Sequence, residues 1–198
     1  MVSIDDRPDD AAMRVHGAWE GDLIMGQGNK SAAATLVERN SRFVIILGLP
    51  DGKQSEGLAD VLIDRFNDLP RHLRGSLTWD QGTEMANHAK LTIATDLPVY
   101  FAHPRSPWER PTNENTNGLI REYLPKGVEI PSNQLYLYAI ADELNDNPTK
   151  PSDSTPPEKS WKTTPQQGSC FHGLTPPRPG FEIEANGVAF QHWLIPVR

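Results

Sequence analysis

The order of strand-like and helix-like segments is the feature that most constrains how this chain folds. Three apolar runs separated by short polar turns come first, and helix-like and strand-like segments then alternate. The predicted strands span 19–25, 32–38, 42–49, 75–80 and 98–102, and the predicted helices span 58–69, 88–95, 112–124 and 133–144. Antiparallel strands followed by helix-connected parallel strands form a mixed sheet covered by helices, so we predict a three-layer α/β fold.

The same pattern divides the 198 residues into three parts. Residues 17–147 hold every predicted strand and helix, enough chain for one domain with its own core. Residues 1–16 are predicted to be a disordered N-terminal remnant. Residues 148–198 contain nine of the 18 prolines and no sustained hydrophobic period, so we expect a disordered tail.

Composition excludes several classes of protein, and the charge alone does not indicate a nucleic-acid binder. The chain has 19 Lys and Arg against 26 Asp and Glu, a net charge of −7, whereas a simple nucleic-acid binder is usually basic. The single cysteine, Cys170, excludes an internal disulfide and a multi-cysteine zinc site. The longest apolar run, 43–47, is far shorter than the roughly 20 residues of a membrane span. Because the N-terminus also lacks an apolar signal region, we expect a soluble cytoplasmic protein with no membrane partner.

Three acidic residues sit where the predicted architecture can bring them together. Asp22 lies in the first strand, Asp80 ends the fourth, and Glu114 opens the helix after the fifth. Three carboxylates in close contact ionise together only when divalent cations neutralise them, and oxygen ligands favour Mg²⁺ or Mn²⁺. Two such ions, about 4 Å apart, stabilise the attacking and leaving oxygens in phosphodiester chemistry. The spacing alone leaves open that these residues are ordinary solvated carboxylates.

Longer motifs around these acids resemble the catalytic domain of IS30-family transposases. The resemblance runs from about residue 17 to about residue 147. The matching segments, in order, are WEGDLI at 19–24, LVER at 36–39, LTWDQGTEM at 77–85, TIAT at 92–95 and SPWERPTNENTNGLIR at 106–121. The resemblance implies a ribonuclease-H-like, retroviral-integrase-like fold with a DDE active site.

On this resemblance, Asp22, Asp80 and Glu114 are the catalytic, metal-binding carboxylates. The 33 residues between Asp80 and Glu114 agree with it. It further implies a DNA transposase that cleaves and joins strands with Mg²⁺ or Mn²⁺, two ions in all. The implied partners are the ends of an insertion sequence, target DNA and further copies of the same chain, and the implied place is the bacterial cytoplasm at the nucleoid.

Residues around Glu114 gain possible roles from the same resemblance. Predicted DNA contacts are Arg110, Asn113, Asn117, Arg121 and Lys126. For the arginines a surface ion pair with Glu109 or Glu122 is an alternative, and Asn113 could instead cap the helix. Three tryptophans could support the carboxylates or simply fill the core: Trp19, Trp79 and Trp108. His88 and His103 are possible acid–base groups, to which we assign no role because the expected chemistry does not require them.

The sequence departs from the family pattern at both ends. The family carries an N-terminal DNA-recognition region, and only about 16 residues precede the first motif here. After Lys150 the family's usual continuation is missing, and we expect residues 151–198 to be an out-of-frame product. Two alternatives to an active transposase therefore stay open: an inactive remnant that only binds DNA or full-length transposase, and a stand-alone nuclease on the same fold.

Overall fold

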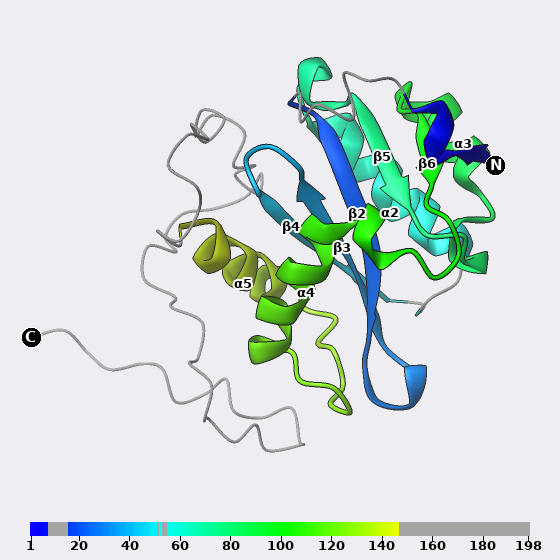
Figure 1. Ribbon diagram of the computed structural model, residues 1–198. Helices are drawn as coiled ribbons and strands as arrows, with labels where there is room; N and C mark the ends of the chain where they lie inside the picture. The colour runs from blue at the N-terminus through cyan, green and yellow to red at the C-terminus, as the bar shows by residue number, and fades with distance from the viewer. Residues whose placement is uncertain (8–15, 51, 53–54, 147–198) are drawn as a thin grey trace, which may run out of the picture.

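A six-stranded mixed sheet forms the centre of the computed structural model, which describes residues 1–7, 16–50, 52 and 55–146 (Figure 1). The strands are ordered β1-β6-β5-β2-β3-β4. Their bounds are Val2–Ser3 for β1, Ala18–Met25 for β2, Ala32–Glu38 for β3, Val44–Leu49 for β4, Ser76–Trp79 for β5 and Val99–Phe101 for β6. The predicted tail, 148–198, lies outside the described residues.

The strand directions confirm the predicted mixed sheet. β2, β3 and β4 form an antiparallel meander, and β5 joins the other side of β2 in the parallel direction, followed by β6. In this register Trp19 pairs with Leu77, so the first and fourth predicted strands are neighbours. The predicted proximity of Asp22 to Asp80 required these two strands to be adjacent.

In the described part of the chain, four α-helices cover the two faces of the sheet, which confirms the predicted α/β class (Figure 1). They are α2 (Ser55–Asp68), α3 (His88–Thr95), α4 (Pro111–Tyr123) and α5 (Gln134–Asp146). Short 3-10 turns lie in the segments between helices and strands, at Ile4–Asp6, Gln27–Asn29, Arg71–Leu73, Thr83–Met85 and Pro107–Glu109. β3 lies between two covered faces, and every one of its residues is buried.

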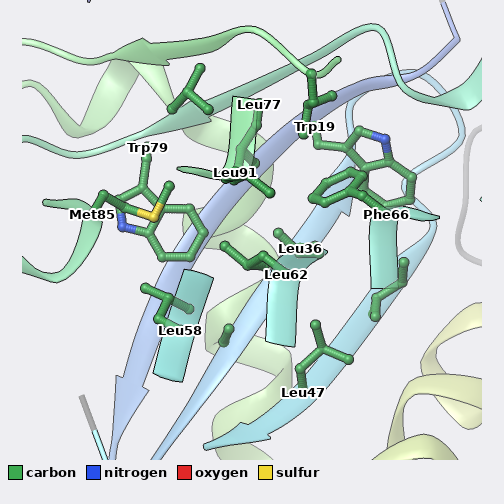
Figure 2. Packing of buried hydrophobic residues seen from close by; sticks show 14 of the residues in the cluster. Trp19, Leu36, Leu47, Leu58, Leu62, Phe66, Leu77, Trp79, Met85 and Leu91 are labelled. Atoms are coloured by element: carbon green, nitrogen blue, oxygen red, sulfur yellow. The ribbon is translucent and has the colours of Figure 1, made fainter. Parts of the chain in front are cut away.

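Two apolar clusters hold the layers together, one on each face. The cluster under α2 and α3 places Leu58, Leu62 and Phe66 of α2 against Trp19 and Leu36 of the sheet (Figure 2). The cluster under α4 and α5 is built from Ile24, Ala33, Val44, Ile46, Ile120, Leu124, Ile130, Leu137, Ile140, Ala141 and Leu144. Burial of this apolar area is the main favourable term in folding.

The first residues of the chain are more ordered than the sequence predicts. Val2 and Ser3 form a short parallel strand that pairs with Tyr100 and Phe101 of β6. This pairing satisfies backbone groups along the edge of the sheet, which would otherwise be open. The predicted disordered remnant is therefore wrong for these residues, while 8–15 lie outside the described residues.

Candidate active site

Asp22 lies on the face of β2 that α4 covers. Side chains alternate along a strand, so Glu20, Asp22 and Ile24 share this face while Trp19 enters the opposite cluster. One carboxylate oxygen of Asp22 accepts a hydrogen bond from the Leu23 backbone N–H at 2.9 Å. The side chain keeps 30% of its surface exposed.

Burial raises the pKa of Asp22 above its ordinary value, because removal from water disfavours the charged form. The positive charge of Arg110 and the Leu23 N–H act in the opposite direction, and the negative charge of Asp80 adds to the rise. Asp22 is thus a partly desolvated carboxylate beside a second one.

Asp80 follows β5 directly, at the carboxyl end of the strand next to β2. Its Oδ1 accepts a hydrogen bond from the Gly82 N–H at 3.2 Å, which fixes the turn after the strand. The side chain is 46% exposed. Asp80 is therefore the more solvated of the two aspartates.

Arg110 links these two aspartates. Its Nη1 lies 3.7 Å from Asp22 Oδ1, and its Nη2 lies 3.9 Å from Asp80 Oδ2. Nη1 also donates a hydrogen bond to the Gly21 carbonyl oxygen at 3.0 Å. Arg110 was predicted to hold DNA phosphate or to pair with Glu109, but its guanidinium faces Asp22 and Asp80 instead and is only 13% exposed.

Glu114 stands on the first turn of α4, and its backbone N–H donates to the Arg110 carbonyl oxygen at 3.2 Å. Its side chain is exposed. Among the residues that the structure describes, no group of three His, Cys, Asp or Glu side chains is close enough to hold a metal ion. The structure thus brings Asp22 and Asp80 together around Arg110 and does not bring the Glu114 carboxylate into the same group.

The aspartate pair nevertheless fits a divalent cation by its chemistry. Both side chains offer oxygen donors of the kind that Mg²⁺ and Mn²⁺ prefer. The pair already has a cationic partner in Arg110, as two neighbouring carboxylates require. Asp22 and Asp80 are the residues that would hold a metal, and Glu114 is the third candidate ligand.

A buried polar network fixes α4 on the sheet beside these residues. Glu20 is fully buried, and its carboxylate is 3.0 Å from Arg39 Nε. The Asn113 N–H donates to Glu20 Oε2 at 2.9 Å, and Asn113 Nδ2 donates to the Glu20 carbonyl oxygen at 3.1 Å. The Thr35 hydroxyl lies 3.3 Å from both Asn113 Oδ1 and the Asp22 carbonyl oxygen. This network connects α4 with β2 and β3 at the position of Asp22.

Asn113 was predicted to contact DNA or to cap the helix, and its location agrees with neither role. Only 1% of the residue is exposed, and the helix begins after Arg110 without a side-chain cap. The sequence did not predict the role of Glu20. A signal for Asn113 was present, because it lies seven residues before the apolar Ile120 and so shares its helix face.

The other predicted DNA contacts occupy different environments. Asn117 donates from Nδ2 to Asp22 Oδ2 at 3.1 Å, which makes it a direct neighbour of the site. Arg121 directs both terminal nitrogens at the Met25 carbonyl oxygen, each at 3.1 Å. Arg121 thus holds the end of β2 against α4, while Lys126 is exposed in the loop after the helix.

The three tryptophans singled out in the sequence, of five in the chain, divide between the core and the surface. Trp19 and Trp79 are buried at 0% and 1% exposure in the cluster beneath α2, as the core-packing alternative predicted (Figure 2). Trp108, in the turn before α4, is 71% exposed and does not support the carboxylates by packing. Gly21 explains how Trp79 fits, because a Cβ there would lie 2.1 Å from Trp79 Cζ3.

A second charged cluster lies at the edge of the sheet near the N-terminus. His103 Nε2 lies 3.2 Å from Asp5 Oδ2, and its Nδ1 lies 2.9 Å from Glu109 Oε1. The hydrogen bond with Glu109 and the charge of Asp5 raise the pKa of His103. This cluster connects the N-terminal residues to the turn that leads into α4.

Comparisons with known proteins agree with this architecture. Residues 12–107 match the family of the integrase core domain. Over 152 residues the chain is 51% identical to the transposase for insertion sequence element IS1086 of Cupriavidus metallidurans, covering 76% of this chain and 44% of that protein. Over 135 residues it is 51% identical to the transposase InsI for insertion sequence element IS30C of Escherichia coli, covering 68% of this chain and 35% of that protein.

Among solved structures, the catalytic core domain of BIV integrase matches with a TM-score of 0.44 and 18% identity, over 53% of this chain and 66% of that chain.

The chain therefore contains an integrase core domain. This domain is homologous to the corresponding region of IS30-family transposases, which confirms the predicted resemblance. The chain spans less than half the length of the two transposases, so the activity and partners of a whole transposase are proposals for this chain. Within the described ranges, every helix is too short or too polar to cross a membrane.

Proposed function

We propose that this chain is the catalytic core of a DNA transposase, a polynucleotidyl transferase that cuts and joins DNA strands. The observation that carries the proposal is the meeting of Asp22 and Asp80, from neighbouring parallel strands, around one guanidinium. Homology with IS30-family transposases supplies the reaction class.

In this proposal Asp22 and Asp80 hold divalent metal, Mg²⁺ or Mn²⁺, and Glu114 completes the ligand set. The bound metal would activate the attacking oxygen and stabilise the leaving oxygen of a phosphodiester. Asn117 orients Asp22 through its 3.1 Å hydrogen bond. The Glu20–Asn113 network holds α4, and with it Glu114, at a fixed place on the sheet.

DNA is the proposed substrate and partner, with further copies of the chain as the proposed assembly. Lys126 and Asn117 are the predicted DNA contacts that stay in the proposal, because the first is exposed and the second is half-buried beside Asp22. Arg110, Asn113 and Arg121 are occupied within the fold.

A second candidate is a remnant that binds DNA or full-length transposase without chemistry. It is favoured by one observation, since the Glu114 carboxylate does not group with the two aspartates in the described residues. The two candidates differ in a measurable way, because only the first requires metal binding at Asp80.

The test is a Mn²⁺ titration of the full chain by calorimetry, together with Mn²⁺-dependent cleavage and joining of a labelled DNA duplex. Asp80→Asn should abolish saturable binding and cleavage. The matched control is Asp96→Asn, at an exposed residue with a left-handed backbone (φ 59°) that Asn tolerates well. Metal binding unaffected by Asp80→Asn would contradict the proposal. Cleavage without joining would instead indicate the stand-alone nuclease.

A further inference from the structure

The position of Arg110 between the two aspartates has a consequence for metal binding. A single guanidinium faces both carboxylates, and each terminal nitrogen is nearest to a different one. With only 13% of its side chain exposed, Arg110 fills space that the two carboxylates share. A cation bound by both carboxylates would need that space.

The contacts show which interactions hold Arg110 in place. The distances of 3.7 and 3.9 Å to the aspartates exceed those of a hydrogen bond, so these contacts are coulombic. The hydrogen bond of the guanidinium runs to the Gly21 carbonyl oxygen at 3.0 Å. Its Nε is buried and, within the described part of the chain, makes no hydrogen bond. A guanidinium held in this way is incompletely satisfied, and it can leave the aspartates without breaking a hydrogen bond to them.

We propose that Arg110 is an internal counter-ion that competes with divalent metal for Asp22 and Asp80, so that metal enters only as the guanidinium moves away. This inference rests on the proposed function, since it assumes that the two aspartates are metal ligands. Arg110 is thereby a positioning residue: it keeps the carboxylates paired when metal is absent and lowers their apparent affinity for metal.

The exchange requires movement of the side chain alone. The backbone of α4 is held independently, because the Asn113 N–H and side chain are bonded to Glu20. The Arg110 carbonyl oxygen accepts from the Glu114 N–H and stays in the first turn of the helix. Metal binding would therefore displace the guanidinium while the backbone of the helix, including that of Glu114, stays in place.

A Mn²⁺ titration of the full chain by calorimetry tests the exchange. Arg110→Gln removes the charge and keeps an amide donor for the Gly21 carbonyl, and Arg105→Gln makes the same change at an exposed arginine. The affinity of Arg110→Gln for Mn²⁺ should rise, on the order of 5- to 150-fold, the range of coupling between two linked ligands. Arg105→Gln and the charge-conserving Arg110→Lys should stay within about three-fold of the original chain.

A second readout measures the unaltered chain and needs a variant for the assignment of one signal only. The NMR signal of the Arg110 side-chain Nε–H, assigned by its loss in Arg110→Lys, should shift on saturation with Mg²⁺. The corresponding signal of Arg105 should not. An Arg110 signal unchanged at saturating Mg²⁺ would overturn the proposal.

The outcomes separate this inference from the proposed function. Equal Mn²⁺ affinity of the original chain and Arg110→Gln, with binding lost in Asp80→Asn, would overturn the counter-ion and leave the metal site standing. An equal gain in Mn²⁺ affinity in Arg105→Gln would also overturn the counter-ion, because the gain would then come from the change in net charge. Failure of both the original chain and Arg110→Gln to bind Mn²⁺ would contradict the metal site itself and the inference with it.

Discussion

Asn113 on α4 and Glu20 on β2 are joined twice, by the Asn113 N–H on the Glu20 carboxylate at 2.9 Å and by Asn113 Nδ2 on the Glu20 carbonyl oxygen at 3.1 Å. Both residues are buried. This double connection sets the distance between the helix that carries Glu114 and the strand that carries Asp22.

Replacing Asn113 should destabilise the fold. Asn113→Ala leaves the buried carbonyl oxygens of Glu20 and Thr35 without the Asn113 Nδ2 donor, which lies 3.1 and 3.4 Å from them. We expect a loss of about 2 to 3 kcal/mol in the free energy of unfolding. Urea unfolding followed by circular dichroism measures it. The control is Asn115→Ala, at an exposed position on the same helix, with an expected change within about 0.5 kcal/mol. Equal effects of the two substitutions would show that the hydrogen bonds of the Asn113 side chain do not hold α4.

Gly21 and Gly118 should respond in opposite ways to alanine. A Cβ at Gly21 would overlap the Trp79 ring at 2.1 Å, so Gly21→Ala should cost about 1 to 3 kcal/mol through overpacking. A Cβ at Gly118 meets nothing within 4 Å, and alanine in a helix stabilises by about 1 kcal/mol over glycine. Thermal unfolding of both variants checks the signs. A neutral Gly21→Ala would contradict the close approach of β2 to Trp79.

Neutralising Asp22 should stabilise the metal-free chain at neutral pH. The pKa of Asp22 is raised in the fold above its ordinary 3.8, chiefly by burial, so its ionised form disfavours folding. The protonated form of Asp22 contributes favourably to the stability of the fold. This contribution is complete below pH 3.8 and is lost as the pH rises through the raised pKa. Asp22→Asn should therefore unfold at a higher temperature than the original chain at pH 7, with no gain at about pH 3. A gain of equal size at both pH values would contradict this assignment.

His103 should make the stability depend on pH in the same direction as Asp22 but at higher pH. The pKa of His103 is raised above 6.5 by the hydrogen bond with Glu109 and the charge of Asp5, so its contribution is complete below 6.5 and is lost as pH rises through the raised pKa. His103→Gln should lower the unfolding temperature at pH 6 more than at pH 9. It should also speed hydrogen exchange at the β1–β6 pairing. His72→Gln, at another exposed histidine, is the control. Identical losses at both pH values would contradict a charged His103.

Most of the fold could be predicted because its elements carry local patterns. The five strands and four helices of residues 17–147 follow from apolar runs and helical spacing, and the structure places each within a few residues of its predicted range. β1 could not be predicted in this way. It has two residues, too few for a period, and its pairing with β6 joins parts of the chain about 100 residues apart.

The site was harder to predict than the fold because burial decides the role of a polar side chain. The sequence predicts that Arg110 and Arg121 contact DNA or form surface ion pairs. In the fold Arg110 faces the two aspartates, and Arg121 donates to the Met25 carbonyl oxygen. Asn113 and Thr116 lie on the same helix face as Ile120 and are buried. Because both side chains are polar, the sequence does not indicate that they are buried. The role of a polar side chain on this helix depends on which strand lies beneath it. The sequence of the helix alone does not show which strand that is.

The most direct test of the central claim is whether Glu114 shares a metal with the two aspartates. Mn²⁺ affinity of the full chain should be measured by calorimetry for Glu114→Gln and for Glu122→Gln, an exposed glutamate further along α4. Loss of a ligand should weaken binding by roughly 100-fold or more, beyond the 10- to 100-fold typical of groups that only support a ligand. Glu122→Gln should leave the affinity unchanged. Equal Mn²⁺ affinity in the two variants would show that Glu114 is no ligand and would contradict a DDE site in this chain.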